Sequence, residues 1–387
     1  MDLDLRYPAV SDLRKRAKAR MPHFAFEYLD SGTGAELQVT RNRDALDDVW
    51  FLPAVLPGEM EHDLSTTFLG QKLSRPFGIA PLGMSGLIWP GAERILATHA
   101  AREGIPYGLS TVATRLPEEV GPQAGEMGWF QLYCPASEDI RRDMMKRAWN
   151  AGFKTLVLTV DVPDDSRRER QRRANLSLPP KITPGMIWET LTHPAWALGT
   201  LKLGRPRLRL PESYIDRSES RSSLDHAGHI IRGAPDWQTL DAIRAEWKGH
   251  LIIKGVMDPD AAKRLVKAGV DAIWVSNHGG RQLEGAPAAI TQLPVIREAV
   301  GSTMPLIYDS GVVSGLDVMR ALALGADLVM LGRAWHYAVA ALGEAGAAHL
   351  HHVLSDDMAL NMAQIGAQTL KELRPRLWQK NNSPTSN

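Results

Sequence analysis

The stretch KAGVDAIWVSNHGGRQL (267–283) contains the signals that decide the fold. An Ala-Gly pair comes first, and glycine is favoured just past the end of a helix. The apolar run AIWVS (272–276) follows, and then a turn that carries His278, two glycines and Arg281. The stretch therefore predicts a helix that leads into a buried strand, and a turn at the strand's end that presents a base and a cation.

The same joint recurs in NAGFKTLVLT (150–159) and ALGADLVML (323–331), and from residue 77 onward short apolar runs alternate with amphipathic segments. Strands that alternate with helices indicate a parallel sheet, and eight such units favour a closed (β/α)8 TIM barrel of the α/β class. The predicted strands are residues 77–80, 106–109, 129–132, 155–159, 251–254, 272–276, 305–309 and 327–331. The helix-like segments between them include 91–103, 137–151, 258–268, 289–300 and 314–324.

Three segments lie outside this alternation. Residues 8–50 form a predicted N-terminal helical cap that starts with Ser11 as its N-cap and stops at Ser31-Gly32. Residues 177–235 form a long insertion after the fourth strand, and connections of that length usually act as lids or binding elements. Residues 379–387 read as a polar tail, so we expect one domain over residues 1–378.

The composition excludes several classes of protein. A hydrophobic content of 44% and a charged content of 23% are ordinary for a globular protein. Because 45 Lys and Arg residues face 44 Asp and Glu residues, no overall field points to nucleic acid. The single cysteine, Cys134, rules out an internal disulfide, and the N-terminus lacks the pattern of a signal peptide. We expect a cytoplasmic protein without a membrane span or a metal site.

Polar or glycine-rich residues follow every predicted strand, and in a (β/α)8 barrel the active site lies at that end of the strands. Strands often end in polar residues merely because they end at water, but eight such ends would converge on one pocket. The residues concerned are Pro81, Leu82, Gly83, Ser110, Gln131, Tyr133, Thr159, Asp161, Arg168, Lys254, Ser276, His278, Arg281, Asp309, Ser310, Gly311, Gly332 and Arg333.

Two of these groups predict specific chemistry. The turns DSG (309–311) and GR (332–333) follow the seventh and eighth strands, where barrels commonly bind phosphate. A lysine that closes an apolar strand, Lys254, would suit the negative charge of a reduced flavin. His278 is suited to take a proton near neutral pH, and Arg281 offers a planar fork for a carboxylate.

Further residues are candidates for the same anion site. Arg168, Tyr28 and Tyr133 would complete the site that Arg281 begins. Arg168 belongs to the run SRRERQRR (166–173), however, and a run of this kind is more often a solvated face.

The motifs SNHGGRQL, FQLY, LTVDVP and ALALGAD occur in this order, and from about residue 8 to 375 the chain resembles the FMN-dependent α-hydroxy acid oxidase and dehydrogenase family. The resemblance implies that His278 takes the substrate's proton, that Asp161 pairs with His278, and that Tyr28, Tyr133, Arg168 and Arg281 hold the substrate. It also implies a homotetramer, and FMN held by Pro81, Leu82, Gly83, Ser110, Gln131, Thr159, Lys254, Ser276, Asp309, Ser310, Gly311, Gly332 and Arg333.

The chain departs from the family pattern at one position in the flavin site. The family usually has arginine two residues after the D-G-G or D-S-G turn, but DSGVVSG has Val313 there. The resemblance therefore predicts weaker FMN binding, or a phosphate site that relies on another cation such as Arg333.

The stretches PLGMSGLIWPGAE and HPAWALGTLKLGRP look more like mandelate dehydrogenase and bacterial L-lactate dehydrogenase than like glycolate oxidase. In mandelate dehydrogenase the corresponding insertion contacts a membrane. The insertion of this chain combines apolar residues with cations, which suits an anionic membrane surface. A lid packed on the barrel is the alternative. The residues are Trp188, Trp196, Leu198, Leu201, Leu203, Lys202, Arg205, Arg207 and Arg209, within residues 185–215.

The sequence thus predicts an FMN-dependent enzyme that oxidises an L-2-hydroxy acid to the 2-oxo acid and passes electrons to a quinone or another acceptor. It would work in the cytoplasm, peripherally on the inner face of the membrane. A hydroxy acid oxidase that uses oxygen, a non-redox phosphate-binding barrel and a ligand-binding protein are alternatives. A pocket wall near Met84, Ile88 and Trp89 would accept a side chain larger than that of glycolate.

Overall fold

The computed structural model describes residues 2–174, 183–215 and 233–378. Eight parallel strands form a closed barrel in the order β10-β3-β4-β5-β6-β7-β8-β9, which confirms the predicted (β/α)8 architecture. All eight predicted apolar runs are barrel strands. Their bounds are β3 (Phe77–Ile79), β4 (Tyr107–Ser110), β5 (Gly128–Leu132), β6 (Thr155–Thr159), β7 (His250–Val256), β8 (Ala272–Val275), β9 (Leu306–Tyr308) and β10 (Leu328–Leu331).

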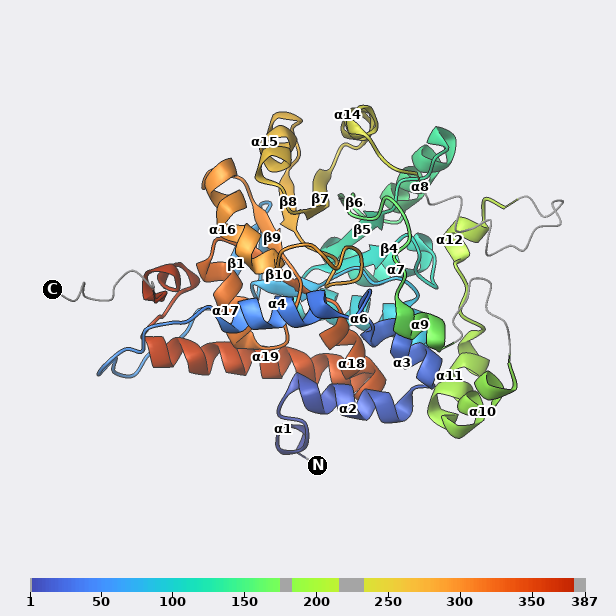
Figure 1. Cartoon of the computed structure of the whole chain (residues 1–387), viewed down its shortest axis with the longest axis horizontal. Coiled ribbons are helices and arrows are strands. Elements are labelled where there is room, and N and C mark those ends of the chain that lie inside the picture. The colour runs from blue at the N-terminus through green and yellow to red at the C-terminus, as the bar shows by residue number, and fades with distance from the viewer. Residues whose placement is uncertain (1, 175–182, 216–232, 379–387) are drawn as a thin grey trace.

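Helices surround the barrel on the outside (Figure 1). The helices that follow successive strands are α6 (Ala92–Glu103), α7 (Pro117–Ala124), α8 (Glu138–Asn150), α14 (Trp237–Glu246), α15 (Pro259–Lys267), α16 (Ala289–Val300), α17 (Gly315–Ala323) and α18 (Arg333–Leu342). The chain adds the short helices α1 (Leu3–Arg6), α5 (Ser85–Ile88) and α9 (Glu169–Arg173), and ends its described part with α19 (Glu344–Ile365) and two single 3-10 turns.

Burial explains why the strands read as continuous apolar runs. Every residue of β3, β4, β5, β6, β8, β9 and β10 is buried, because helices cover the outside of the barrel and side chains fill its inside. A hairpin of β1 (Thr66–Phe68) and β2 (Gln71–Leu73) packs on the interior core, with the ring centroids of Phe68 and Trp129 5.9 Å apart. Trp129 lies near the start of β5, so the hairpin covers the barrel end opposite to the predicted site.

The N-terminal cap consists of α2 (Val10–Arg20), α3 (His23–Asp30) and α4 (Leu37–Asp47). The prediction that Ser11 is the N-cap was wrong, because Ala9 holds that position and Ser11 lies inside α2. The carboxylate of Asp12 accepts the backbone N–H of Ala9 at 3.2 Å, and this contact does the capping. Pro22 precedes α3 and separates the cap into distinct helices, because it cannot donate a backbone hydrogen bond.

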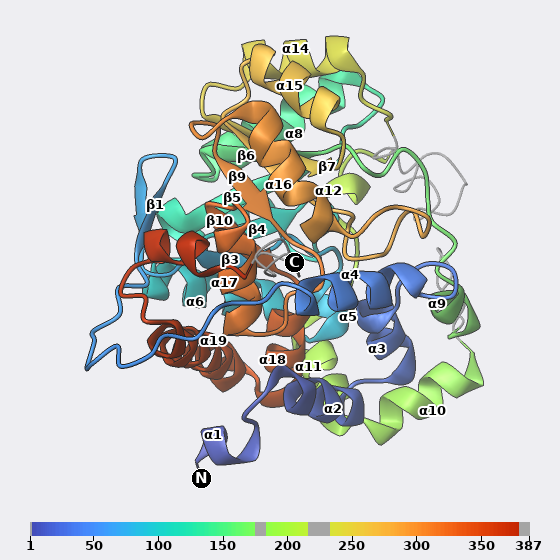
Figure 2. The ribbon, with the colours of Figure 1, turned by 60° about the vertical axis from the view of Figure 1, so that its left-hand side comes forward.

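The described part of the insertion forms α10 (Pro184–Thr192), α11 (Pro194–Leu203) and α12 (Arg209–Glu212). In both views α10 and α11 lie beside α2 and α3 (Figures 1 and 2). The Trp196 ring packs edge-on against Phe24 with centroids 5.7 Å apart, which fastens α11 to α3. Residues 177–182 and 216–232 of the predicted insertion, and the tail 379–387, lie outside the described residues. Among the described helices, none has the length and apolar character needed to cross a membrane.

Candidate active site

A cavity of about 1570 Å³ opens at the carboxyl ends of the barrel strands, where the sequence placed the site. Ser110, Gln131, Thr159, Ser276 and Asp161 stand behind its wall rather than in it. The predicted residues that line the cavity are Tyr28, Pro81, Leu82, Gly83, Tyr133, Arg168, Lys254, His278, Arg281, Asp309, Ser310, Gly311, Gly332 and Arg333.

Three polar side chains form a buried hydrogen-bonded row across the ends of β4, β5 and β6. The Ser110 hydroxyl donates to Gln131 Oε1 at 2.7 Å, and Gln131 Nε2 donates to Thr159 Oγ1 at 3.0 Å. A buried polar group without a partner costs free energy, so this row fixes the orientation of the Gln131 amide.

A second row crosses the ends of β7, β8 and β9. Lys254 Nζ donates to Ser276 Oγ at 2.9 Å, and it lies 3.2 Å from Asp309 Oδ2. The Ser276 and Ser310 hydroxyls both donate to Asp309 Oδ1, at 2.5 and 2.7 Å. The lysine is buried, and its ammonium is held by a carboxylate at the floor of the cavity. This arrangement places one fixed cation in the lining of the cavity.

His278 is held by an unusual backbone conformation. Its φ is 58°, and Gly279 and Gly280 follow with φ values of 62° and 76°. A left-handed conformation is strained for residues other than glycine, and such strain often occurs at functional sites. The turn directs the imidazole into the cavity, where His278 Nδ1 lies 3.1 Å from Asp161 Oδ1.

The His278–Asp161 pair is largely buried, and each partner alters the other's protonation. Burial lowers the pKa of His278, and the Asp161 charge opposes that shift only in part. Burial alone would raise the pKa of Asp161, but the charges of His278 and Lys254 lower it. At neutral pH the imidazole is therefore neutral and the carboxylate ionised, so one nitrogen of His278 is available to take a proton while the other faces Asp161.

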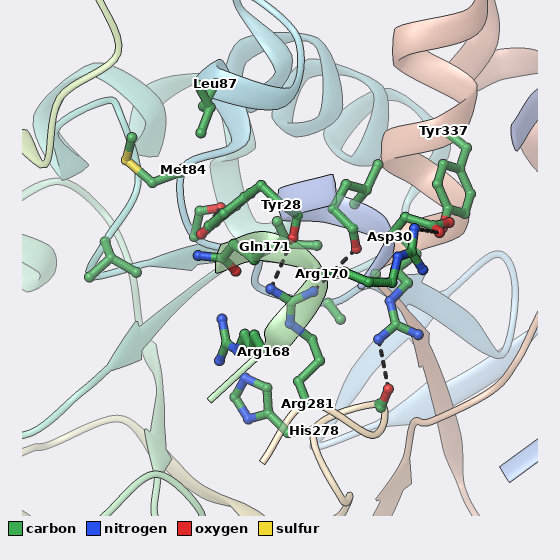
Figure 3. A pocket seen from close by; sticks show the side chains of 18 of the residues that line it. Tyr28, Asp30, Met84, Leu87, Arg168, Arg170, Gln171, His278, Arg281 and Tyr337 are labelled. Atoms are coloured by element: carbon green, nitrogen blue, oxygen red, sulfur yellow. Dashed lines mark hydrogen bonds and ion pairs between the residues drawn. The ribbon is translucent and has the colours of Figure 1, made fainter. Parts of the chain in front are cut away.

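Two guanidinium groups meet beside His278 (Figure 3). Arg281 donates to the backbone carbonyls of Tyr28, Leu29 and Ser31 at 3.0, 3.3 and 2.7 Å. Burial and repulsion from Arg168 and Arg333 hold the pKa of Arg281 well below its usual range. Repelling cations in a cavity favour the binding of an anion, which would relieve the repulsion.

Arg168 and Tyr28 border the same space. Arg168 Nη2 donates to Gln282 Oε1 at 3.0 Å, which directs the guanidinium toward the turn that carries Arg281. The Tyr28 hydroxyl donates to the carbonyl of Gly83 at 3.1 Å. A Cβ built on Gly83 would lie 2.5 Å from Val112 Cγ2, so this position has no room for a larger residue unless its neighbours shift.

The predicted phosphate end has glycine turns but few cations that are not already paired. Gly311 has a φ of 90°, and Arg333 Nη2 donates to the carbonyl of Gly279 at 2.7 Å. Val313 lines the cavity and is 42% exposed. Arg43 also lines the cavity, but Asp317 accepts two hydrogen bonds from it, each of 2.6 Å. Sequence reasoning missed Arg43, because it lies on a cap helix far from the strand ends.

The predicted pocket wall needs a correction. Met84 lines the cavity as expected, but Ile88 and Trp89 are buried behind it and Leu87 faces the cavity instead (Figure 3). Consecutive residues of a helix point in directions about 100° apart, so α5 presents Leu87 to the cavity and Ile88 to the core. The insertion adds Met186, Leu191 and Trp196 to the lining.

The cavity fits FMN in the character of its lining. Pro81–Gly83, the buried Lys254 and glycine turns with Arg333 line the cavity, and hydrogen-bonding side chains at the strand ends stand behind them. This set matches a planar polar ring that carries a phosphate. A family model described as FMN-dependent dehydrogenase matches residues 17–380. The chain belongs to this family. Its cofactor is therefore FMN, and it is an oxidoreductase of the hydroxy acid dehydrogenase type.

Individual relatives agree with this assignment. The chain is 41% identical over 366 residues to the L-lactate dehydrogenase of Xanthobacter autotrophicus, with 94% of each chain covered. It is 40% identical over 368 residues to that of Serratia proteamaculans, covering 94% of this chain and 96% of the other. The crystal structure of the monotopic membrane protein (S)-mandelate dehydrogenase matches with a TM-score of 0.90 at 33% identity, covering 96% and 99% of the two chains.

Proposed function

We propose that this enzyme oxidises an L-2-hydroxy acid to the 2-oxo acid, and that His278, Asp161, Arg168, Arg281, Tyr28 and Tyr133 form the substrate site. The observation that carries the proposal is geometric: His278, with Asp161 3.1 Å from its Nδ1, faces the same cavity as the guanidinium groups of Arg168 and Arg281. A base and an anion site in one cavity suit a carboxylate whose neighbouring carbon bears a hydroxyl group.

Oxidation removes two protons and two electrons from the substrate. His278 would take one proton, and FMN, when bound, would supply the redox chemistry by taking the electron pair together with the other proton. Asp161 stabilises the imidazolium that forms, because its pKa keeps it ionised beside the ring. Arg281 and Arg168 bind the substrate carboxylate. Tyr28 and Tyr133 border the site, and burial raises the pKa of both phenols, so they remain neutral hydrogen-bond donors.

The same proposal assigns the two hydrogen-bonded rows and the glycine turns to FMN. Lys254 would stabilise negative charge on the reduced flavin ring. The polar edge of the ring would be held by the two hydrogen-bonded rows, to which Ser110, Gln131, Thr159 and Ser276 belong. Asp309 holds Lys254 in place. Gly311, Gly332 and Arg333 would receive the phosphate.

The insertion supports a contact with an anionic membrane and a lipid-soluble acceptor such as a quinone. Trp188 and Leu201 are 68% and 82% exposed, and Leu198 and Leu203 are exposed as well. Trp196 does not belong to this surface, because it is buried and donates to the carbonyl of Leu87 at 2.9 Å.

The cations of the insertion divide in the same way. In the described part of the insertion, Arg207 pairs with Glu212 and Arg209 with Glu119. Lys202 and Arg205 are exposed and would face lipid headgroups, although Arg205 also lines the cavity. Each basic residue near an anionic surface contributes about 1 kcal/mol. Because the inner side of the same helices lines the cavity, the segment would serve as both lid and membrane contact.

A visible spectrum of the purified protein, followed by anaerobic addition of L-2-hydroxy acids, tests the catalytic proposal. We expect a yellow protein whose flavin bleaches with at least one hydroxy acid and regains colour faster with a quinone than with oxygen. Faster recovery with oxygen would identify an oxidase, and a chromophore that no hydroxy acid bleaches would refute the proposed reaction.

The membrane contact and the oligomer are tested separately. Replacing Trp188, Leu198 and Leu201 with serine should abolish sedimentation with anionic vesicles while dye-linked hydroxy acid oxidation persists. A wild-type protein that does not sediment with such vesicles would leave the segment as a lid alone. Light scattering of the wild type should give the mass of a tetramer, as the family resemblance implies.

A further inference from the structure

Arg170 is the centre of a charged cluster at the edge of the cavity, although it lies in the run SRRERQRR that usually indicates a solvated face. Its guanidinium lies 2.7 Å from Glu27, 2.8 Å from Asp30 and 3.0 Å from Glu36. Arg14 also binds Asp30, at 2.6 Å. We define the carboxylate cluster as Glu27, Asp30 and Glu36 together with Arg14 and Arg170.

The cluster is shielded from water on the side of its carboxylates. The side chains of Glu27 and Asp30 are 8% and 4% exposed, whereas that of Arg170 is 30% exposed. The Tyr337 hydroxyl donates to Asp30 at 2.7 Å. Hydrogen bonds from Arg14, Tyr337 and Arg170 outweigh burial and hold the pKa of Asp30 far below its usual range. Removal of Arg170 would leave Glu27 without its arginine, whereas Asp30 would keep Arg14 and Tyr337 as partners.

Arg170 connects two elements that carry substrate residues. It lies on α9, and Arg168 is the N-cap of that helix, with a left-handed φ of 41°. Its partners Glu27 and Asp30 lie on α3, which also carries Tyr28. The carbonyl of Tyr28 accepts a hydrogen bond from Arg281. The position of α9 relative to α3 therefore sets the distance between Arg168 and the Tyr28–Arg281 side of the anion site (Figure 3).

We infer that Arg170 is a positioning residue, which holds Arg168 at the distance from Arg281 and Tyr28 that the substrate carboxylate requires. The inference rests on the proposed function. A left-handed arginine at a helix N-terminus is strained, and a five-residue helix cannot hold it without tertiary contacts. The three carboxylates on α3 and the following loop provide these contacts.

The test compares Arg170→Gln and Arg170→Lys with Arg173→Gln, which removes the same charge from an exposed position of the same helix. Small displacements in an anion site weaken binding strongly, so we expect Arg170→Gln to raise KM for the hydroxy acid about tenfold or more. The dissociation constant of the 2-oxo acid, followed by the flavin spectrum, should rise in parallel. The turnover number should fall by less than about threefold, since loss of binding shared by ground and transition states raises KM alone.

Controls separate positioning from general loss of structure. Arg170→Lys should recover part of the binding. Arg173→Gln should leave KM near its wild-type value, and the FMN content of all three variants should stay near that of the wild type. If Arg170→Gln does not fold, Glu36→Gln removes one partner of Arg170 and should raise KM by a smaller factor of about two to three, as expected for one partly exposed ion pair.

Several outcomes would overturn the inference. One is an unchanged KM in Arg170→Gln and in Glu36→Gln. Another is a rise in KM for Arg173→Gln that equals the rise for Arg170→Gln. A third is a variant in which KM rises while turnover and FMN content fall to the same extent. A wild-type flavin that no hydroxy acid reduces would instead refute the proposed function.

Discussion

The turns after β8 and β9 have similar backbone conformations but present different chemical groups to the cavity. Each leaves a buried strand and passes through left-handed residues, His278 to Gly280 in the first and Ser310 to Gly311 in the second. The first turn presents the imidazole of His278, which lies beside Asp161, and the guanidinium of Arg281, which donates to the carbonyl of Ser31. The second presents backbone and a hydroxyl, and it ends at Val313, where the family resemblance led us to expect arginine.

The difference indicates how each turn tolerates change. Proton transfer needs one particular side chain at one place, so the turn after β8 has no substitute for His278. Phosphate binding is shared among backbone N–H groups, glycine turns and cations, so the loss of one arginine leaves a weaker site rather than none. We therefore expect substitutions in the first turn to have the larger effects.

The largest effect should come from His278→Gln. Glutamine has similar polarity but cannot take a proton, and general-base catalysis is typically worth about 100- to 10,000-fold. Stopped-flow measurement should show flavin reduction slowed by a factor in that range, with FMN content unchanged. Near-normal reduction would show that another group removes the proton.

Arg281→Lys should have the next largest effect. Lysine keeps the charge, but a single ammonium cannot donate to the carbonyls of Tyr28 and Ser31 and also bind a carboxylate in a bidentate manner. Loss of hydrogen bonds to a charged group costs roughly 1.5 to 3 kcal/mol, so kcat/KM should fall about 10- to 100-fold. Steady-state kinetics with unchanged KM and turnover would place the substrate carboxylate elsewhere.

The pH dependence should reveal the protonation state of the same turn. Burial lowers the pKa of His278 below its usual 6.5, and the base must be neutral to act. Thus kcat/KM should be level at neutral pH, and its acid limb should have a midpoint below pH 6.5, falling about tenfold per pH unit beyond it. Asp161 raises the pKa of His278, so Asp161→Asn should move this limb to still lower pH. A limb above pH 6.5 would contradict the assignment.

The sequence predicted the barrel well because its strands are buried on both sides and therefore show as apolar runs. It also predicted that residues from the strand ends share one cavity, since strand ends in a barrel converge. It failed where neighbours in space are distant in the chain. In the sequence Arg170 belongs to a run that predicts a solvated face, but in the structure it binds carboxylates of α3. Trp196 was predicted to contact a membrane, but its ring packs against Phe24. The hairpin β1–β2 is too short to show a pattern, and its turn uses Leu69 in a left-handed conformation.

Val313→Arg should have the smallest effect and bears directly on the difference between the turns. An arginine at this half-exposed position would add a charge-assisted contact to the phosphate, worth about 1 kcal/mol or a roughly fivefold tighter FMN complex. Asp317 already binds Arg43 and Arg320, so it would not capture the new guanidinium without releasing one of them. Equilibrium dialysis of FMN should show the gain, and a high salt concentration should reduce it because the site is open to water. Equal or weaker retention of FMN would mean that the turn after β9 has been rebuilt around valine, with Arg333 and the glycine backbone as a complete phosphate site.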